Sequence, residues 1–265
     1  MQFKHYLFAF IALSAFHTSL RAQNEAITET QLLYMNDFNF GLNANTLGFG
    51  GAQFRYGWHK TGSKTNFLET ELAIVDDPKS VKRYGFSDNP SQYSYGKLNT
   101  VFFWRIGYGR KTELTERSYK NALGLNVVYS GGLNLALLKP VYIDYYYSYD
   151  SGQPGGYLIS ERYDPVKHSD INRIYGNSSF AYGFGELRVI PGAYGRLGLA
   201  IDYGQYPDDY KSLEVGMTLD VFGINTNGSS DVPVSLGQGL PIMANISKRE
   251  YFFGLYLALN WGWKK

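Results

Sequence analysis

The last fifteen residues of the chain, 251–265, alternate between two kinds of side chain. The even positions carry mostly small or polar residues, and every odd position up to 263 is apolar or aromatic: Tyr251, Phe253, Leu255, Leu257, Leu259, Trp261 and Trp263. A period of two places the two sets on opposite faces of a β-strand. An apolar face that ends in two tryptophans is typical of a strand that meets lipid, with aromatic rings at the headgroups.

The same alternation recurs in seven further segments, each of which we expect to be a β-strand. These segments are 38–45, 53–58, 68–74, 98–109, 123–130, 196–203 and 213–221. Their lengths approach or exceed the 9–11 residues that a tilted strand needs to cross a bilayer. Charged residues within them occur only on the small, polar face: Arg55, Glu69, Glu71, Arg105, Arg196, Asp202, Glu214 and Asp220.

The N-terminus has the layout of a secretory signal peptide covering residues 1–22. Lys4 and His5 precede an apolar run over 6–16, and the expected cleavage site lies between Ala22 and Gln23. The run is shorter than the roughly 20 apolar residues of a membrane-spanning helix. The chain has no cysteine, which excludes a lipoprotein signal and disulfides. We expect one all-β domain over residues 23–265.

The alternation alone does not say which face of a barrel points inward. In a soluble lipocalin-like barrel the apolar face surrounds a ligand, whereas in a transmembrane barrel it meets lipid. The terminal aromatic strand, the export signal and the continuous apolar face favour an antiparallel transmembrane β-barrel. The eight charges would then fill the lumen, and we expect them to form ion pairs, because buried charges need partners.

Strand number depends on two ambiguous segments. Over 123–149 the apolar set keeps to odd numbers, which favours one long strand leaving the membrane or a hairpin with an odd-length loop. Over 180–190 the phase breaks, which indicates a bulged strand or an inserted loop. The barrel has eight strands if neither segment adds a crossing and ten if both do. We expect long extracellular loops at 77–96, 150–173 and 225–248, since such barrels keep their short turns in the periplasm.

Residues suited to catalysis are few. Only His59 and His168 follow the signal peptide, and His168, Ser169 and Asp170 are consecutive. Neighbours in sequence seldom adopt the geometry of a catalytic triad. We therefore predict no enzymatic activity, no cofactor and no metal site. The nearly balanced net charge of +2 predicts no nucleic-acid partner.

Aromatic residues are frequent in two of the predicted loops. Tyrosine combined with Gly, Ser and Asn forms adaptable recognition surfaces at low entropic cost. Such residues are candidates for binding a partner protein or glycan, or else pack against one another beside the membrane: Tyr84, Phe86, Tyr93, Tyr95, Tyr157 and Tyr163.

In its export signal, alternating strands and terminal NWGWKK, the chain resembles the small Tyr- and Asn-rich outer-membrane β-barrels of Bacteroidetes. Its last strand also resembles the signal read by the barrel-assembly machinery, although Lys264 and Lys265 follow the final aromatic residue. The resemblance implies location in the cell outer membrane, with lipid and that machinery as partners. Some family members are accessory subunits of secretion or biogenesis assemblies.

We therefore expect a non-enzymatic structural or interaction component, with other outer-membrane proteins as candidate partners. A passive small-solute channel is one alternative. An outer-membrane lipid hydrolase built on His168 and Ser169 is another.

Overall fold

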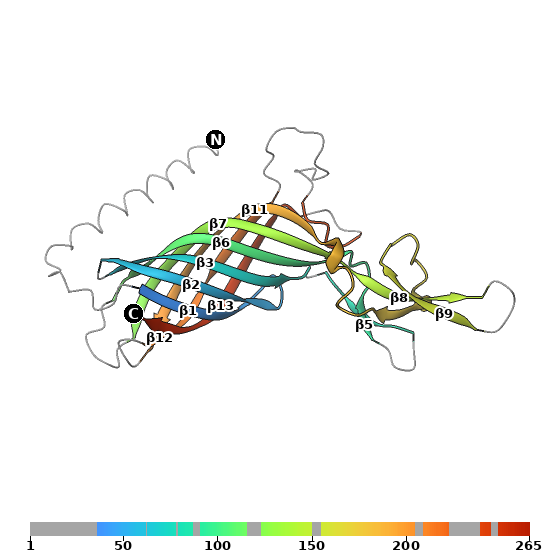
Figure 1. The fold of residues 1–265 in the computed structure, drawn as a ribbon, viewed down its shortest axis with the longest axis horizontal. Helices are drawn as coiled ribbons and strands as arrows, with labels where there is room; N and C mark the ends of the chain where they lie inside the picture. Colours follow the sequence, from blue (N-terminus) through green and yellow to red (C-terminus); the bar gives the residue numbers. More distant parts are fainter. Residues whose placement is uncertain are drawn as a thin grey trace, which may run out of the picture. The chain divides into compact units, whose positions relative to one another are not determined.

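The computed structural model describes residues 36–61, 63–77, 79–86, 91–115, 123–149, 155–204, 209–222, 239–244 and 249–265. The predicted signal peptide and most of segment 225–248 lie outside these ranges. Eight strands form a closed barrel (Figure 1): β1 (Asn36–Asn45), β2 (Gly50–Thr61), β3 (Lys64–Val75), β6 (Asn99–Glu113), β7 (Gly124–Pro140), β11 (Arg188–Asp202), β12 (Asp209–Phe222) and β13 (Tyr251–Lys264). The all-β antiparallel barrel is confirmed, with eight strands rather than ten.

Closure of the barrel brings together strands that are far apart in sequence. The C-terminal strand β13 pairs with β1, with Leu259 opposite Leu42. Around the barrel the order is β1-β13-β12-β11-β7-β6-β3-β2. In a ring of eight, β3 therefore faces β12 across the lumen, and β2 faces β11.

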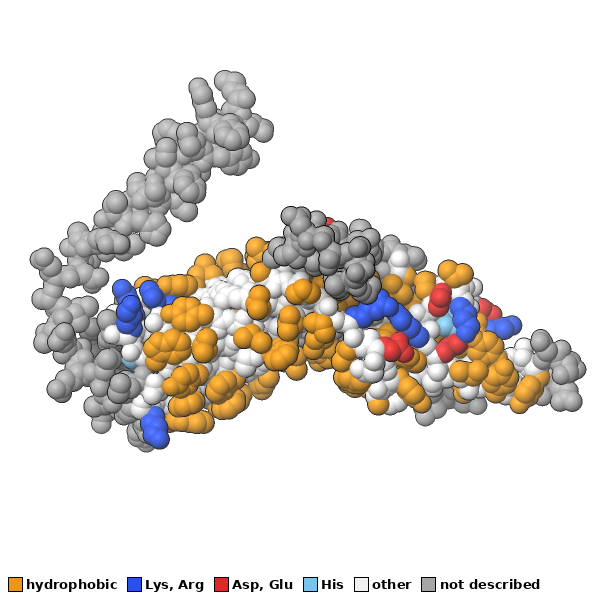
Figure 2. All heavy atoms as spheres, turned by 45° about the horizontal axis from the view of Figure 1, so that its top comes forward, with side chains coloured by type: hydrophobic (Ala, Val, Ile, Leu, Met, Phe, Trp, Pro, Cys, Tyr) orange, Lys and Arg blue, Asp and Glu red, His pale blue; other side chains and the backbone are white. Residues whose placement is uncertain are grey.

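The strands turn their polar face inward and their apolar face outward. All eight predicted lumen charges are buried, whereas outward residues such as Leu42 and Leu255 are 57% and 52% exposed. Figure 2 shows apolar side chains over the outer wall on one face of the barrel. This is the inverse of a lipocalin-like barrel and fits a wall surrounded by lipid. Within the described ranges, no helix is long and apolar enough to span a bilayer.

Both ambiguous segments leave the strand number at eight. Strand β7 runs on, after Val141, into β8 (Tyr142–Ser148), so segment 123–149 is one extended stretch that continues past the barrel. Segment 180–187 is an inserted turn that contains the 3-10 helix η2 (Phe184–Glu186), and β11 begins directly after it. The connections β3–β6, β7–β11 and β12–β13 all leave the same end of the antiparallel barrel, as expected for long loops on one side.

Residues 79–86, 91–95, 141–149 and 155–177 lie outside the barrel and contain two small sheets; we call these residues the outer module. Strand β8 pairs with β9 (Gly156–Arg162) on one side and β10 (Ile174–Asn177) on the other, and β4 (Lys82–Tyr84) pairs with β5 (Gln92–Ser94). The 3-10 helix η1 (Ile171–Arg173) precedes β10. The module has its own core, formed by Tyr93, Ile143, Tyr145, Tyr163 and Ile174.

Candidate functional site

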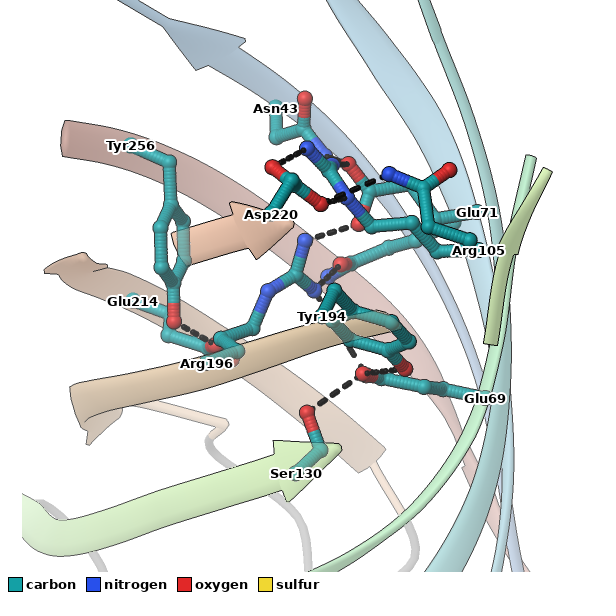
Figure 3. A network of polar contacts seen from close by, with 12 residues as sticks. Asn43, Glu69, Glu71, Arg105, Ser130, Tyr194, Arg196, Glu214, Asp220 and Tyr256 are labelled. Carbon is teal, nitrogen blue, oxygen red and sulfur yellow. Dashed lines mark hydrogen bonds and ion pairs between the residues drawn. The ribbon is translucent and has the colours of Figure 1, made fainter. Parts of the chain in front are cut away.

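Seven of the eight predicted lumen charges form one continuous chain of ion pairs, part of which is drawn in Figure 3. Positive and negative groups alternate along it in the order Asp220, Arg105, Glu71, Arg196, Glu69, Arg55 and Glu214. Three guanidinium groups thus lie between four carboxylates. Each arginine contacts two acidic residues, so each of these seven charges has a partner of opposite sign.

The two ends of this series of ion pairs, Asp220 and Glu214, both lie on strand β12. Arg105 binds both oxygens of Asp220, at 2.8 and 2.7 Å, and its Nη1 lies 2.7 Å from Glu71 Oε1. Arg55 binds both oxygens of Glu214, at 2.5 and 3.1 Å, and its Nε lies 2.9 Å from Glu69. Bidentate arginine–carboxylate pairs are strong and directional. Each of these two arginines therefore joins a carboxylate on β12 to a carboxylate on β3, and these strands face each other across the lumen.

Arg196 on β11 links the two halves of the network. Its Nη2 pairs with Glu71, and its Nη1 lies 3.5 Å from Glu69 Oε2. The same Nη1 donates to Gln53 Oε1 at 2.8 Å, on the strand that faces β11. The guanidinium therefore spans the centre of the lumen.

Neutral side chains complete the network by donating to its carboxylates. Tyr194 donates to Glu69 at 2.8 Å, and Tyr256 donates to Glu214 at 2.6 Å. Further donors are Ser130, Asn43 and Asn134, which bind Glu69, Glu71 and Asp220 respectively. The sequence prediction did not include these residues, although each keeps the inward phase of its strand.

Glycines provide the space that the larger side chains occupy. A Cβ added at Gly107 would collide with the Tyr194 hydroxyl, and one at Gly198 would collide with the Tyr256 hydroxyl. Both tyrosines are donors in the network. The small residues on the polar face are thus needed for close packing in a narrow barrel.

Asp202, the eighth predicted charge, is also buried but lies apart from this chain, toward the short-turn end. It accepts a hydrogen bond from the Gly204 amide at 3.3 Å. At the same end Lys111 Nζ lies 3.2 Å from Asp37 and 4.4 Å from the centre of the Tyr210 ring. Extending the alternation by one step at the strand ends would have identified Asp37 and Lys111.

An apolar cluster, which we call the apolar plug, occupies the other end of the lumen. The rings of Phe103, Phe222 and Phe252 pack together with centroid distances of 5.0–5.9 Å. Leu240 and Ile242 are buried in the same cluster. The Ile242 carbonyl accepts from the Leu98 amide at 2.8 Å, which ties segment 240–243 to the barrel. This segment falls in a predicted loop, and the sequence did not indicate that it is buried.

His168 supports the outer module rather than a triad. Its imidazole is fully buried between Tyr145 and Tyr163, with centroid distances of 4.8 and 5.8 Å. Its Nδ1 accepts from the Asp164 amide at 2.9 Å, so Nε2 carries the proton and donates to Glu161 at 2.8 Å. Ser169 is exposed, and both ring nitrogens of His168 are already engaged by other residues.

The predicted loop aromatics divide into two groups. Tyr84, Phe86 and Tyr157 are exposed, at 67%, 69% and 47%. Tyr93 and Tyr163 are buried in the core of the module, and half-buried Tyr95 packs against that core. Tyr93 and Tyr163 are therefore core residues of the module and not candidates for contact with a partner, because β8 and β10 cover their rings. In the part of the chain that is described, no cluster of three acidic, His or Cys residues could hold a metal ion.

A closed eight-stranded barrel with an apolar outside and a charged inside has the architecture of the small β-barrels of bacterial outer membranes. No protein-family model matches the chain, and no curated protein matches it significantly. Among solved structures, it is similar to Neisserial surface protein A (8% identity, TM-score 0.38, covering 88% of this chain and 97% of the other). It is also similar to Ail, the attachment invasion locus protein of Yersinia pestis (7% identity, TM-score 0.35, covering 88% and 99%).

Proposed function

We propose that the protein is a non-conducting, non-enzymatic barrel of the cell outer membrane that displays the outer module for binding a partner protein. The observation that supports a non-conducting barrel is that side chains occupy the lumen at two levels. The charge network fills its centre, and the apolar plug fills the end nearest the long loops. A channel would need this space empty.

The outer surface supports insertion in the membrane. Aromatic rings gather at the short-turn end of the barrel, where Trp263 lies 5.8 Å from Phe38 and Trp58 lies 6.0 Å from Tyr108. Such rings suit the water–lipid boundary. We also propose that β13 is the strand read by the barrel-assembly machinery, since its pairing with β1 is the step that closes the barrel.

The outer module offers an edge strand for a partner. Strand β9 pairs only with β8 within the described sheet, and Tyr157, Leu158 and Ile159 on it are 47%, 51% and 41% exposed. An open edge with exposed apolar side chains can accept an extended strand from another protein. Exposed Tyr84 and Phe86 belong to the same module. The resemblance to accessory subunits favours another outer-membrane protein as that partner.

Affinity purification from the native membrane tests this function. Tagged protein extracted in mild detergent is expected to carry a stoichiometric partner, identified by mass spectrometry. A double substitution of Leu158→Asp and Ile159→Asp should remove that partner, because charge on the edge opposes strand addition. The matched control is Val166→Asp, at an 84% exposed position elsewhere in the module.

Two results would overturn the proposal, and a third would change its ligand. Steady single-channel currents from a lone monomer would indicate a channel. Release of fatty acid from lipid, abolished by Ser169→Ala, would indicate a hydrolase. Binding of a glycan with no protein partner would keep the display role but change the class of ligand.

A further inference from the structure

Segment 180–187 lies against the outside of the barrel wall, at the end nearest the long loops. The Phe180 ring is 6.5 Å from Phe102, which shares the outward phase of β6 with exposed Trp104. Gly183 sits directly against the carbonyl of Pro140 at the end of β7, where an added Cβ would collide with it, and has a φ of 87°. The segment is thus packed onto the wall that faces lipid.

The apolar belt of the barrel continues over this segment. Phe180, Phe184 and Leu187 are 63%, 46% and 38% exposed, and Val189 at the start of β11 is 47% exposed. Large apolar side chains in this position would face water if the membrane ended at the last barrel residue. Their continuity with the lipid-facing wall indicates that lipid covers them as well.

The side chain of a lysine lies beneath the same rings. Lys139 has the outward phase of β7, which it shares with Leu133, yet it is only 4% exposed. Its Nζ lies 4.6 Å from the centre of the Phe180 ring and 5.3 Å from that of Phe184. Cation–π contacts of this kind stabilise an ammonium group only partly.

Within the described ranges, Lys139 has no hydrogen bond or ion pair. Glu186, the acidic residue of the segment, accepts a hydrogen bond from the Tyr142 hydroxyl at 2.5 Å, and its Oε2 lies 3.5 Å from Arg162 Nη1. Lys97, another lysine at this end of the barrel, is paired with Asp76 at 3.1 Å. Lys139 therefore has a largely covered side chain whose ammonium group has no acidic partner among the described residues, and an anion would supply that partner.

We infer that segment 180–187 and Lys139 form a binding site for a phosphate-bearing lipid of the outer leaflet. The lipid chains would contact Phe180, Phe184 and the wall beneath them. The headgroup phosphate would supply the anion that Lys139 lacks, because lysine binds phosphate as a compact point charge. The inference rests on the membrane location of the proposed function and adds a specific lipid contact to it.

The first test asks whether the segment meets lipid. Since the chain has no cysteine, Phe184→Cys introduces a single site for a fluorescent label. In phosphatidylcholine vesicles, brominated acyl chains should quench this label strongly. A label at Val166→Cys in the outer module should be quenched little. Equal, weak quenching at both sites would overturn the inference.

The second test asks whether Lys139 selects anionic headgroups. Folded protein in detergent is titrated with phosphatidylglycerol or phosphatidylcholine, and bound lipid is counted by native mass spectrometry. The wild-type protein should prefer phosphatidylglycerol, and Lys139→Gln should reduce that preference at least about tenfold, as expected for loss of a charge-assisted contact. Lys97→Gln removes a cation that already has a partner and should change the preference less than about twofold.

The remaining outcomes separate this site from the proposed function. Full competition by millimolar inorganic phosphate would show that the site takes a free anion, and it would overturn the lipid assignment. A heat-modifiable, inserted barrel with no headgroup preference would overturn the site and leave the proposed function standing. Failure to insert into vesicles would overturn both. If Lys139→Gln does not fold, the wild-type preference and the label at position 184 still decide the question.

Discussion

Arg196 on β11 reaches across the lumen and pairs with Glu71 on β3. On the nearer side of the barrel, β7 and β6 separate these two strands. Both side chains are 1% exposed. Without this arginine, Glu69 and Glu71 would each lose one of their two ion-pair partners inside the barrel.

We therefore expect Arg196→Met to lower the free energy of unfolding by about 3–5 kcal/mol, as for other broken buried ion pairs. Unfolding in urea, followed by heat-modifiable gel mobility, measures the change. The double variant Arg196→Met with Glu71→Gln should recover part of the loss, since it also removes the unpaired negative charge. A single variant as stable as the wild type would contradict the role of this pair.

Gly107 should tolerate no larger side chain. Gly107→Ala places a methyl group against the Tyr194 hydroxyl that donates to Glu69, and we expect a loss of about 1–3 kcal/mol from overpacking. Gly195→Ala is the matched control, because a Cβ there meets nothing within 4 Å. Equal stability of the two variants in the same unfolding assay would show that the lumen is not closely packed.

The wild-type protein should give no steady conductance in planar bilayers. Leu240→Asp with Ile242→Asp should drive segment 240–243 out of the apolar plug, since buried charges need partners. Limited proteolysis should then cut this segment faster. Conductance should remain absent, because the charge network still fills the centre of the lumen. Large currents from either protein would refute a closed lumen.

Stability of the outer module should depend on pH through Glu161. Burial opposes ionisation, but hydrogen bonds from Lys167, Tyr147 and His168 outweigh it and lower the pKa of Glu161 from 4.5 to about 2. Because the pKa is lower in the folded state, the contribution to stability is complete above pH 4.5 and disappears as the pH falls toward 2.

Glu161→Gln should therefore speed amide hydrogen exchange in β8 and β9 at pH 7, on the order of tenfold after allowance for partial exposure of the carboxylate. The difference from the wild-type protein should shrink as the pH falls below 4.5. Ser169→Ala, at an exposed position of the outer module, should behave as wild type at every pH. A Glu161→Gln effect that is independent of pH would show that ionisation of Glu161 is not its cause.

Much of the barrel could be predicted from the sequence, because a period of two is a local property. Residues 251–263 show one face of β13 directly, and the eight charged residues identify the opposite face of their strands. The unbroken phase over 123–149 also indicated a strand that runs past the barrel, although it left a hairpin open as an alternative.

Tertiary structure decided what depends on closure of the ring. Alternation is symmetric, so only the closed barrel places Arg196 inside and Leu197 outside. Arg105 pairs with Asp220, 115 residues away, because the strands that carry them line the same narrow lumen. The burial of Tyr163 and Leu240 likewise depends on distant residues that cover them. The local alternation of side chains does not predict such contacts, because they form only when the whole sheet has closed.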